Sequence, residues 1–224
     1  MPSENSLRLS EQDRKLLVCS AAIISICALS YELIISSLSS YYFGNAVSHF
    51  SITIGLFMTF MGLGAWLSKK FEKDLLDNFI LTELFVGLMG GCSALILIAS
   101  FSWTENFYPV FVILVGLIST AIGLEVPLLT RLVTGDGNLR DSLSNVLALD
   151  YLGALLASLL FPFLLLPYMG LLQTCFLMGI LNLGVGIYLC FYFRTKLRNY
   201  RLTCLLYTSP SPRDRTRSRM PSSA

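Results

Sequence analysis

The sequence predicts an all-α integral membrane protein, a multi-pass bundle of six transmembrane helices with both termini in the cytoplasm. Three observations predict this class: a high share of hydrophobic residues, six apolar runs of membrane-spanning length, and an uneven distribution of Lys and Arg between the runs. Of the 224 residues, 54% are hydrophobic and 13% are charged. Soluble domains carry about 25% charged residues, so this balance indicates a chain that lies in a lipid bilayer.

Each apolar run is long enough to cross about 30 Å of hydrocarbon as an α-helix that rises 1.5 Å per residue. Tyr and Trp residues, which are typical of membrane interfaces, lie near the ends of several runs. The connections are short, so consecutive helices are expected to pack as antiparallel hairpins. The predicted helices cover residues 16–40, 48–68, 79–101, 109–130, 143–166 and 170–193.

The basic residues predict the orientation of these helices. Lys and Arg precede the first run, follow the sixth, and lie between the second and third and between the fourth and fifth. The other three connections, near 41–47, 102–108 and 167–169, contain neither residue. Because Lys and Arg are retained on the cytoplasmic side of membranes, both termini are predicted to be cytoplasmic.

Four carboxylates lie inside the apolar runs, where an ionised side chain costs at least a few kcal/mol unless it is paired, protonated or facing water. The helical rise places Glu83, Glu125 and Asp150 at a similar depth, about 8–12 Å inside the cytoplasmic boundary. Glu32 lies instead in the outer half of the first helix. Arg131 is the obvious partner for Asp150 or Glu125, because its long side chain can reach toward the interface.

Three roles remain open for this polar cluster. The carboxylates can form ion pairs and hydrogen bonds that fix the register of the helices, line a water-accessible cavity that binds a cation, or act as protonated groups in a proton relay. No metal site is expected, because one histidine and scattered carboxylates make a weak zinc constellation. Glycine-rich phosphate loops and Ser/His/Asp arrangements are absent, so no catalytic or cofactor-binding residue is assigned. The net charge of +2, without a basic groove, argues against nucleic acid as a partner.

Small residues recur at spacings that let transmembrane helices approach closely, as in Gly87 with Gly91 and Gly153 with Ala157. Such faces could also join copies of the chain into a homo-oligomer. A weak internal sequence similarity relates Tyr-Glu-Leu-Ile at 31–34 to Leu-Glu-Val-Pro at 124–127, in helices that are predicted to run in opposite directions. Inverted repeats of three helices, which are frequent in transporters, would produce this relation.

Several phrases, in this order, resemble the N-terminal membrane domain of the membrane-bound spermidine synthases (polyamine aminopropyltransferases). The family-like positions include Tyr31, Pro127, Tyr151 and Gly153. The phrases are Tyr-Glu-Leu at 31–33, Ser-His-Phe-Ser at 48–51, Gly-Leu-Glu-Val-Pro-Leu-Leu at 123–129, Leu-Ala-Leu-Asp-Tyr-Leu-Gly-Ala-Leu at 147–155 and Phe-Pro-Phe-Leu-Leu-Leu-Pro at 161–167.

The resemblance implies a bacterial plasma (inner) membrane protein whose helices precede a cytoplasmic Rossmann-like domain. That domain would transfer an aminopropyl group from decarboxylated S-adenosylmethionine, the co-substrate, to putrescine. Its glycine loop and catalytic aspartates are not found in this sequence, so the fragment is expected to be inactive alone although the parent protein is a transferase. No cofactor is expected in the fragment itself.

The end of the chain differs abruptly from the helices. From about Cys204 it is polar and rich in Ser, Pro and Arg, and it resembles translated adapter or vector sequence fused to an interrupted reading frame. A natural disordered basic tail is the alternative. The chain is therefore divided into a cytoplasmic segment (1–15), the six-helix domain (16–193), a basic juxtamembrane segment (194–203) and a disordered tail (204–224), and the native sequence is expected to continue beyond Thr203.

Two other functions remain open besides the aminopropyltransferase hypothesis. Six helices with intramembrane carboxylates also suit a polyamine or cation transporter or half-transporter, because carboxylates at one depth can form charge-assisted hydrogen bonds with spaced ammonium groups. A pure membrane anchor or assembly scaffold is the third reading.

Overall fold

The computed structural model describes residues 9–71, 73–103, 107–134 and 138–197, and this part of the chain is almost entirely helical, without a strand. The all-α prediction is confirmed. Residues of the predicted segments 1–15 and 194–203 that fall outside these ranges, and the whole predicted tail 204–224, lie outside the described residues. The main helices in order are α1 (Glu11–Phe43), α2 (Ala46–Leu67), α3 (Leu75–Trp103), α4 (Phe107–Thr134), α5 (Leu139–Leu160) and α6 (Leu166–Tyr192).

Helix ends differ from the apolar runs where polar residues can extend a helix. α1 begins at Glu11, five residues before the predicted run, because the Asp13 carboxylate accepts a hydrogen bond of 2.7 Å from the backbone N–H of Ser10. Such a bond satisfies one of the donors that a helix start leaves free. A short 3₁₀ turn (Ser68–Lys70) follows α2, and a π-helical turn (Phe161–Leu165) joins α5 to α6.

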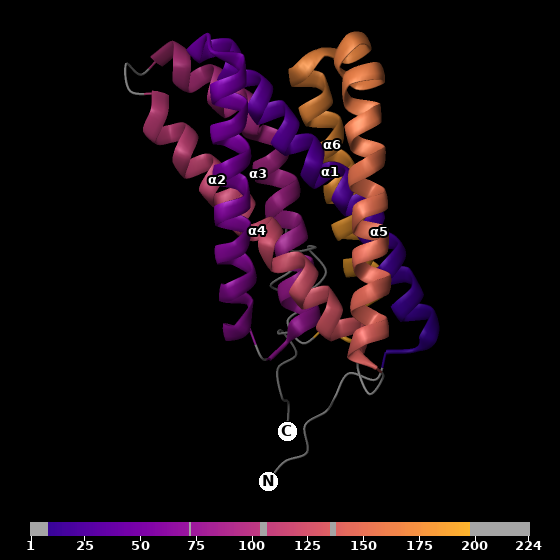
Figure 1. The fold of residues 1–224 in the computed structure, drawn as a ribbon. Helices are drawn as coiled ribbons and strands as arrows, with labels where there is room; N and C mark the ends of the chain where they lie inside the picture. Colours follow the sequence, from indigo (N-terminus) through magenta and orange to yellow (C-terminus); the bar gives the residue numbers. More distant parts are fainter. Residues whose placement is uncertain (1–8, 72, 104–106, 135–137, 198–224) are drawn as a thin grey trace, which may run out of the picture.

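Five helical stretches in the described residues are long and apolar enough to cross a membrane, and the last of them runs for 54 residues, Leu139–Tyr192. This stretch is not one straight helix. Gly170 has φ 74° and ψ 177°, values that interrupt a helix and that glycine adopts without strain. Near this residue the chain turns back, so that α5 and α6 run in opposite directions (Figure 1).

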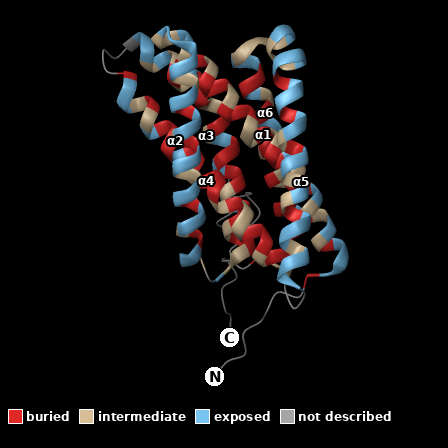
Figure 2. Ribbon diagram, in the orientation of Figure 1, coloured by how far each residue is buried: buried red, intermediate tan, exposed pale blue. Residues whose placement is uncertain are grey.

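The most extensive contacts join helices that are not consecutive: α3 packs on α6, α2 on α4, and α1 on α5. The outer faces of α2 and α5 remain largely exposed (Figure 2), as expected of helices that face lipid. Glycine permits the close approach at each of the three pairs. A Cβ atom added at Gly91 would lie 2.8 Å from Gly179 Cα, one at Gly64 would lie 2.1 Å from the Thr120 carbonyl oxygen, and one at Gly153 would lie 2.4 Å from the Ala22 carbonyl oxygen.

These contacts have the pattern of an inverted repeat. If α1–α2–α3 is exchanged with α4–α5–α6, the pair α1/α5 becomes α4/α2, and the pair α3/α6 becomes itself. The sequence carries a matching signal, because Leu-Gly-Ala-Trp-Leu at 63–67 in α2 has its counterpart in Leu-Gly-Ala-Leu-Leu at 152–156 in α5. The glycine of each motif makes the close contact described above.

Two apolar clusters fill the interior of the bundle. The first cluster lies toward the α1–α2 and α3–α4 connections and includes Ile34, Ile35, Phe57, Leu97 and Phe111. The second cluster lies toward the opposite end and includes Leu17, Leu76, Phe79, Leu132 and Leu189. On each of α1, α3, α4 and α6, the change from one cluster to the other occurs near the middle of the helix.

Candidate functional site

A layer of buried polar residues lies where the two apolar clusters meet. Glu83 lies just before the point on α3 where one cluster gives way to the other. Glu125 on α4 and Asn182 on α6 lie at the corresponding points of their helices. Tyr31 extends from the first cluster on α1. Glu83, Asn182 and Tyr31 are fully buried, and Glu125 is 6% exposed. These four residues are called the polar layer below.

Glu83 and Asn182 connect the two halves of the repeat. The Asn182 side-chain N–H donates to the backbone carbonyl of Glu83 over 3.2 Å, and Gly186, one turn further along α6, leaves room for Leu84 and for the Glu83 Cβ. This bond uses the amide nitrogen of Asn182 and leaves its carbonyl oxygen free. Along the helices, Glu83 lies about 12 Å from the start of α3, and Asn182 lies about 15 Å from the end of α6.

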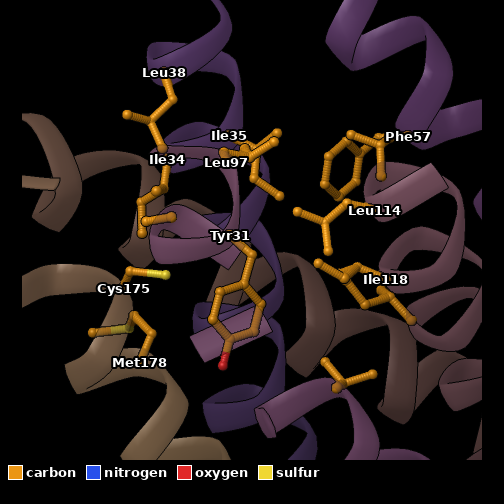
Figure 3. Close-up of a cluster of buried hydrophobic side chains, with 14 of the residues drawn as sticks. Tyr31, Ile34, Ile35, Leu38, Phe57, Leu97, Leu114, Ile118, Cys175 and Met178 are labelled. Atoms are coloured by element: carbon orange, nitrogen blue, oxygen red, sulfur yellow. The ribbon is translucent and has the colours of Figure 1, made fainter. Parts of the chain in front are cut away.

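Tyr31 places a hydroxyl group at the same boundary. Its ring packs against the backbone of Gly90, where an added Cβ atom would lie 2.6 Å from the ring. Figure 3 shows the hydroxyl pointing away from Ile34, Ile35 and Leu38 in the first cluster. A larger residue at position 90 would displace the ring, so this glycine positions the hydroxyl.

Five oxygen atoms of the polar layer have no hydrogen-bond partner among the described residues. They are Glu83 Oε1 and Oε2, Glu125 Oε1, Asn182 Oδ1 and the Tyr31 hydroxyl. An unpaired buried polar group costs about 1–3 kcal/mol, and more if it is charged. The layer therefore lowers the stability of the bundle rather than raising it.

Asp150 adjoins the polar layer through a small pocket between α1, α3, α4 and α5. The Glu125 and Asp150 side chains both line this pocket, and its other walls are apolar. Glu83 and Asp150 each lie within electrostatic reach of the Glu125 carboxyl group, so Glu125 connects the three predicted carboxylates. The hydroxyl of Ser25 donates to the Asp150 backbone carbonyl over 2.7 Å, which fixes α5 against α1 at this level.

Arg131 does not pair with Glu125 or Asp150, contrary to the prediction. Its guanidinium donates to the carbonyl oxygens of Ser68 and Phe71, over 3.0 and 3.2 Å, and to the Ser68 hydroxyl over 3.3 Å. The reason is helical geometry: six residues rotate a side chain by about 600°, so Arg131 leaves α4 about 120° away from Glu125. Arg131 instead holds the connection between α2 and α3.

The remaining predicted positions lie outside the polar layer. Glu32 is buried, at 7% exposure, but it leaves α1 about 100° from Tyr31. Pro127 lies within α4 and lacks an N–H, so the carbonyl of Gly123 receives no helical bond from it. Tyr151 is exposed, whereas Gly153 packs against α1. Within the described ranges, no group of three or more His, Cys, Asp or Glu side chains could hold a metal ion.

An ion pair joins the start of α1 to the segment that follows α6. Lys196, after α6, donates to the Asp13 carboxylate in the first turn of α1 over 2.5 Å. Asp13 precedes the apolar run that begins at residue 16. Burial opposes its ionisation, but the hydrogen bonds from Lys196 and the Ser10 N–H prevail and lower the pKa of Asp13 below its ordinary value.

Asn182 was not predicted as a site residue. The sequence did contain a signal, because a polar amide inside the apolar run 170–193 is unfavourable in lipid unless it has a partner, as the four carboxylates are. The contribution of Gly90 to the position of Tyr31 has no comparable signal, since it depends on which helix faces α1.

Comparison with curated proteins adds a family to this geometry. The chain is 45% identical to a polyamine aminopropyltransferase of Leptospira interrogans over 172 residues, which are 77% of this chain and 34% of the relative. It is 40% identical to polyamine aminopropyltransferase 2 of Ralstonia nicotianae (81% of this chain, 36% of the relative) and 38% identical to the Oceanobacillus iheyensis enzyme (83% and 37%). The matches fit a fragment of that family. The chain spans about a third of the length of these relatives, and no family model and no solved structure matches it.

Proposed function

We propose that this chain is the membrane-spanning part of a polyamine aminopropyltransferase in a bacterial plasma membrane. The observation that carries the proposal is the combination of extent and composition. Similarity covers 77–83% of this chain but only 34–37% of the relatives, and the described part of the chain is a bundle of long apolar helices. The remaining two thirds of the parent protein would then hold the chemistry.

Six crossings with both termini of the chain in the cytoplasm form part of the proposal. The turn at Gly170 divides Leu139–Tyr192 into two opposed helices, and the Asp13–Lys196 ion pair places the start of α1 beside the end of α6. An even number of crossings would produce this arrangement. Lys69, Lys70 and Arg131 lie at the same end of the bundle, as positive charges on the cytoplasmic side would.

In the parent protein, a domain that follows α6 would transfer the aminopropyl group from decarboxylated S-adenosylmethionine to putrescine. No residue of this chain is assigned a step in that transfer. The bundle would hold the following domain at the cytoplasmic surface, on the side of the second apolar cluster and of the pocket lined by Glu125 and Asp150.

A chimera tests the proposal. Residues 9–197 replace the matching third of the Leptospira interrogans relative, and the product is assayed for membrane fractionation and for transfer of a labelled aminopropyl group to putrescine. We expect a membrane-bound, active chimera. A chimera that stays soluble, or one that is membrane-bound but inactive while the unaltered relative is active, would contradict the proposal.

Cysteine labelling tests the orientation. Val47, at the start of α2, and Lys69, after its end, are both exposed and form a matched pair. In an otherwise cysteine-free chain, a membrane-impermeant maleimide added to whole cells should label Val47→Cys and not Lys69→Cys. The reverse pattern would place the termini outside the cytoplasm.

A further inference from the structure

We propose that the polar layer of Tyr31, Glu83, Glu125 and Asn182 binds an organic cation with two or more ammonium groups, such as a linear diamine. The pocket lined by Glu125 and Asp150 is its entrance. The charges and acceptors of the layer carry this proposal, which rests on the proposed function only for the choice of probe.

The charge of the layer is one-sided. Glu83 and Glu125 of the layer and the adjoining Asp150 come from three helices, and none of them takes part in the ion pairs seen in the described residues, such as Glu11–Lys15 and Asp13–Lys196. The nearest arginine on α4, Arg131, is bonded to the α2–α3 connection. Neighbouring buried carboxyl groups resist ionising together, so a bound cation is the partner that would let them stay ionised.

The unpaired atoms of the layer match an ammonium group. All five are oxygens that can accept a hydrogen bond, and an ammonium group has three or, if substituted, fewer donors and no acceptor. The Asn182 amide is oriented so that its N–H binds the Glu83 carbonyl and its oxygen stays available. Tyr31 and Asn182 are neutral, so their orphaned oxygens are evidence independent of the carboxylates.

The apolar lining of the pocket favours a chain-like ligand over a hydrated metal ion. The helices around it must move apart to admit such a ligand, because the pocket holds only about 10 Å³. The carboxylates pass from full burial at Glu83, through Glu125, to the half-buried Asp150. The walls beside Glu125 and Asp150 are hydrocarbon: Ala21, Ile24, Phe79, Val126, Leu129 and Val146. Methylene groups between two ammonium groups would contact these walls, whereas a hydrated metal ion would lose its water ligands there.

The layer also lies where the two repeats meet. Glu83 belongs to the first half, and Glu125 and Asn182 belong to the second. Sites near the middle of the membrane, between inverted repeats, are where many carriers bind their substrates. The Gly91–Gly179 crossing of α3 and α6 lies two turns from Glu83, so a small change at this contact would alter the spacing of the layer.

Direct binding to the purified 224-residue chain in lipid nanodiscs tests the proposal. Isothermal titration compares 1,4-diaminobutane with butylamine, which has the same carbon chain and one charge fewer, and with Mg²⁺. We expect saturable binding of the diamine that is at least about tenfold tighter than that of butylamine, because one charge-assisted contact is lost, and no displacement by Mg²⁺.

Matched variants locate the site. Glu83→Gln and Glu125→Gln should each weaken diamine binding by about tenfold or more, whereas Glu32→Gln, a buried carboxylate outside the layer, should leave it unchanged. Equal affinities for diamine and butylamine, no saturable binding, or equal effects of Glu83→Gln and Glu32→Gln would overturn the proposal. If a Gln variant fails to fold, the comparison of the two amines on the unaltered chain still decides. The titration involves no aminopropyl transfer, so an inactive chimera with a diamine-binding chain refutes the proposed function alone.

Discussion

The crossing of α3 and α6 provides the sharpest test of the packing. A Cβ atom at Gly179 would lie 2.6 Å from Gly91 Cα and 3.1 Å from the Gly87 carbonyl oxygen, and both of these are backbone atoms. Gly184, on the same helix, has open space around its Cα, with nothing within 4 Å of an added Cβ. Alanine at either position gains the same helix propensity, about 0.8–1.0 kcal/mol, so the pair isolates the clash.

The magnitude follows from the overlap. Ordinary van der Waals contact begins at 3.4 Å, so Gly179→Ala forces the two helices apart by about 1 Å, which costs about 1–3 kcal/mol in a packed interior. For a chain of this size, 1 kcal/mol changes Tm by about 2–4 °C, so Gly179→Ala should melt about 2–12 °C below Gly184→Ala.

Thermal unfolding of both variants in one detergent, followed by the loss of helical circular dichroism, measures this difference. Equal Tm values would refute the close crossing, and with it the inverted-repeat arrangement that has this contact at its centre. A lower Tm for Gly184→Ala than for Gly179→Ala would indicate that the face of α6 carrying Gly184, and not the face carrying Gly179, packs against α3.

Three further predictions concern polar contacts. Arg131→Met removes the hydrogen bonds to Ser68 and Phe71 and should lower the free energy of unfolding by about 1.5–3 kcal/mol in the same assay. Arg140→Met, at an exposed position, should change it by less than about 0.5 kcal/mol. Equal losses would show that Arg131 does not stabilise the α2–α3 connection. The folded pKa of Asp13 lies below its ordinary value of 3.8, so the ion pair stabilises the fold above that pH, and this contribution is lost as the pH falls through the folded pKa. The difference in Tm between the unaltered chain and Asp13→Asn should therefore shrink as the pH is lowered from 7 to 3. A difference that stays constant over this range would contradict the ion pair. Glu83→Gln should raise the Tm without added amine, because it removes a buried carboxyl group whose oxygens have no partner and whose ionisation would be costly there. A lower Tm would show that the Glu83 carboxyl group stabilises the fold.

The helices themselves could be predicted from the sequence because chains suited to lipid meet a simple requirement. A backbone in hydrocarbon must bond to itself, so each long apolar run becomes a helix. The run that ends near residue 166 could not be delimited as accurately, because Phe161–Leu165 continues as a π-helical turn and the break falls at Gly170. Hydropathy does not distinguish these backbone states.

The choice of partner helices could not be predicted from composition. Consecutive helices were expected to form the main hairpins, yet the broadest contacts join α1 to α5, α2 to α4 and α3 to α6. Backbone approach at Gly64, Gly91, Gly153 and Gly179 decides these pairs, whereas Gly62 and Gly184 face open space. The sequence shows every glycine alike, and only the three-dimensional arrangement separates the two kinds.

The carboxylates illustrate the same limit for the site. Depth along a helix follows from residue counting, which predicts that Glu83, Glu125 and Asp150 lie near one level. Rotation about the helix axis decides partners, and it turns Arg131 away from Glu125. The sequence thus indicated which charges are buried but not that they lack a basic partner.

The unpaired state of the layer argues against a purely structural role. A buried network that fixes helix register has its donors and acceptors matched, as Arg131 has with Ser68 and Phe71. The polar layer instead presents five acceptor oxygens without a partner among the described residues, at the boundary of two apolar clusters. Filling that boundary with hydrocarbon would remove the cost of burying them. A chain that keeps these oxygens at the junction of its repeats therefore gives up stability there, as binding sites do.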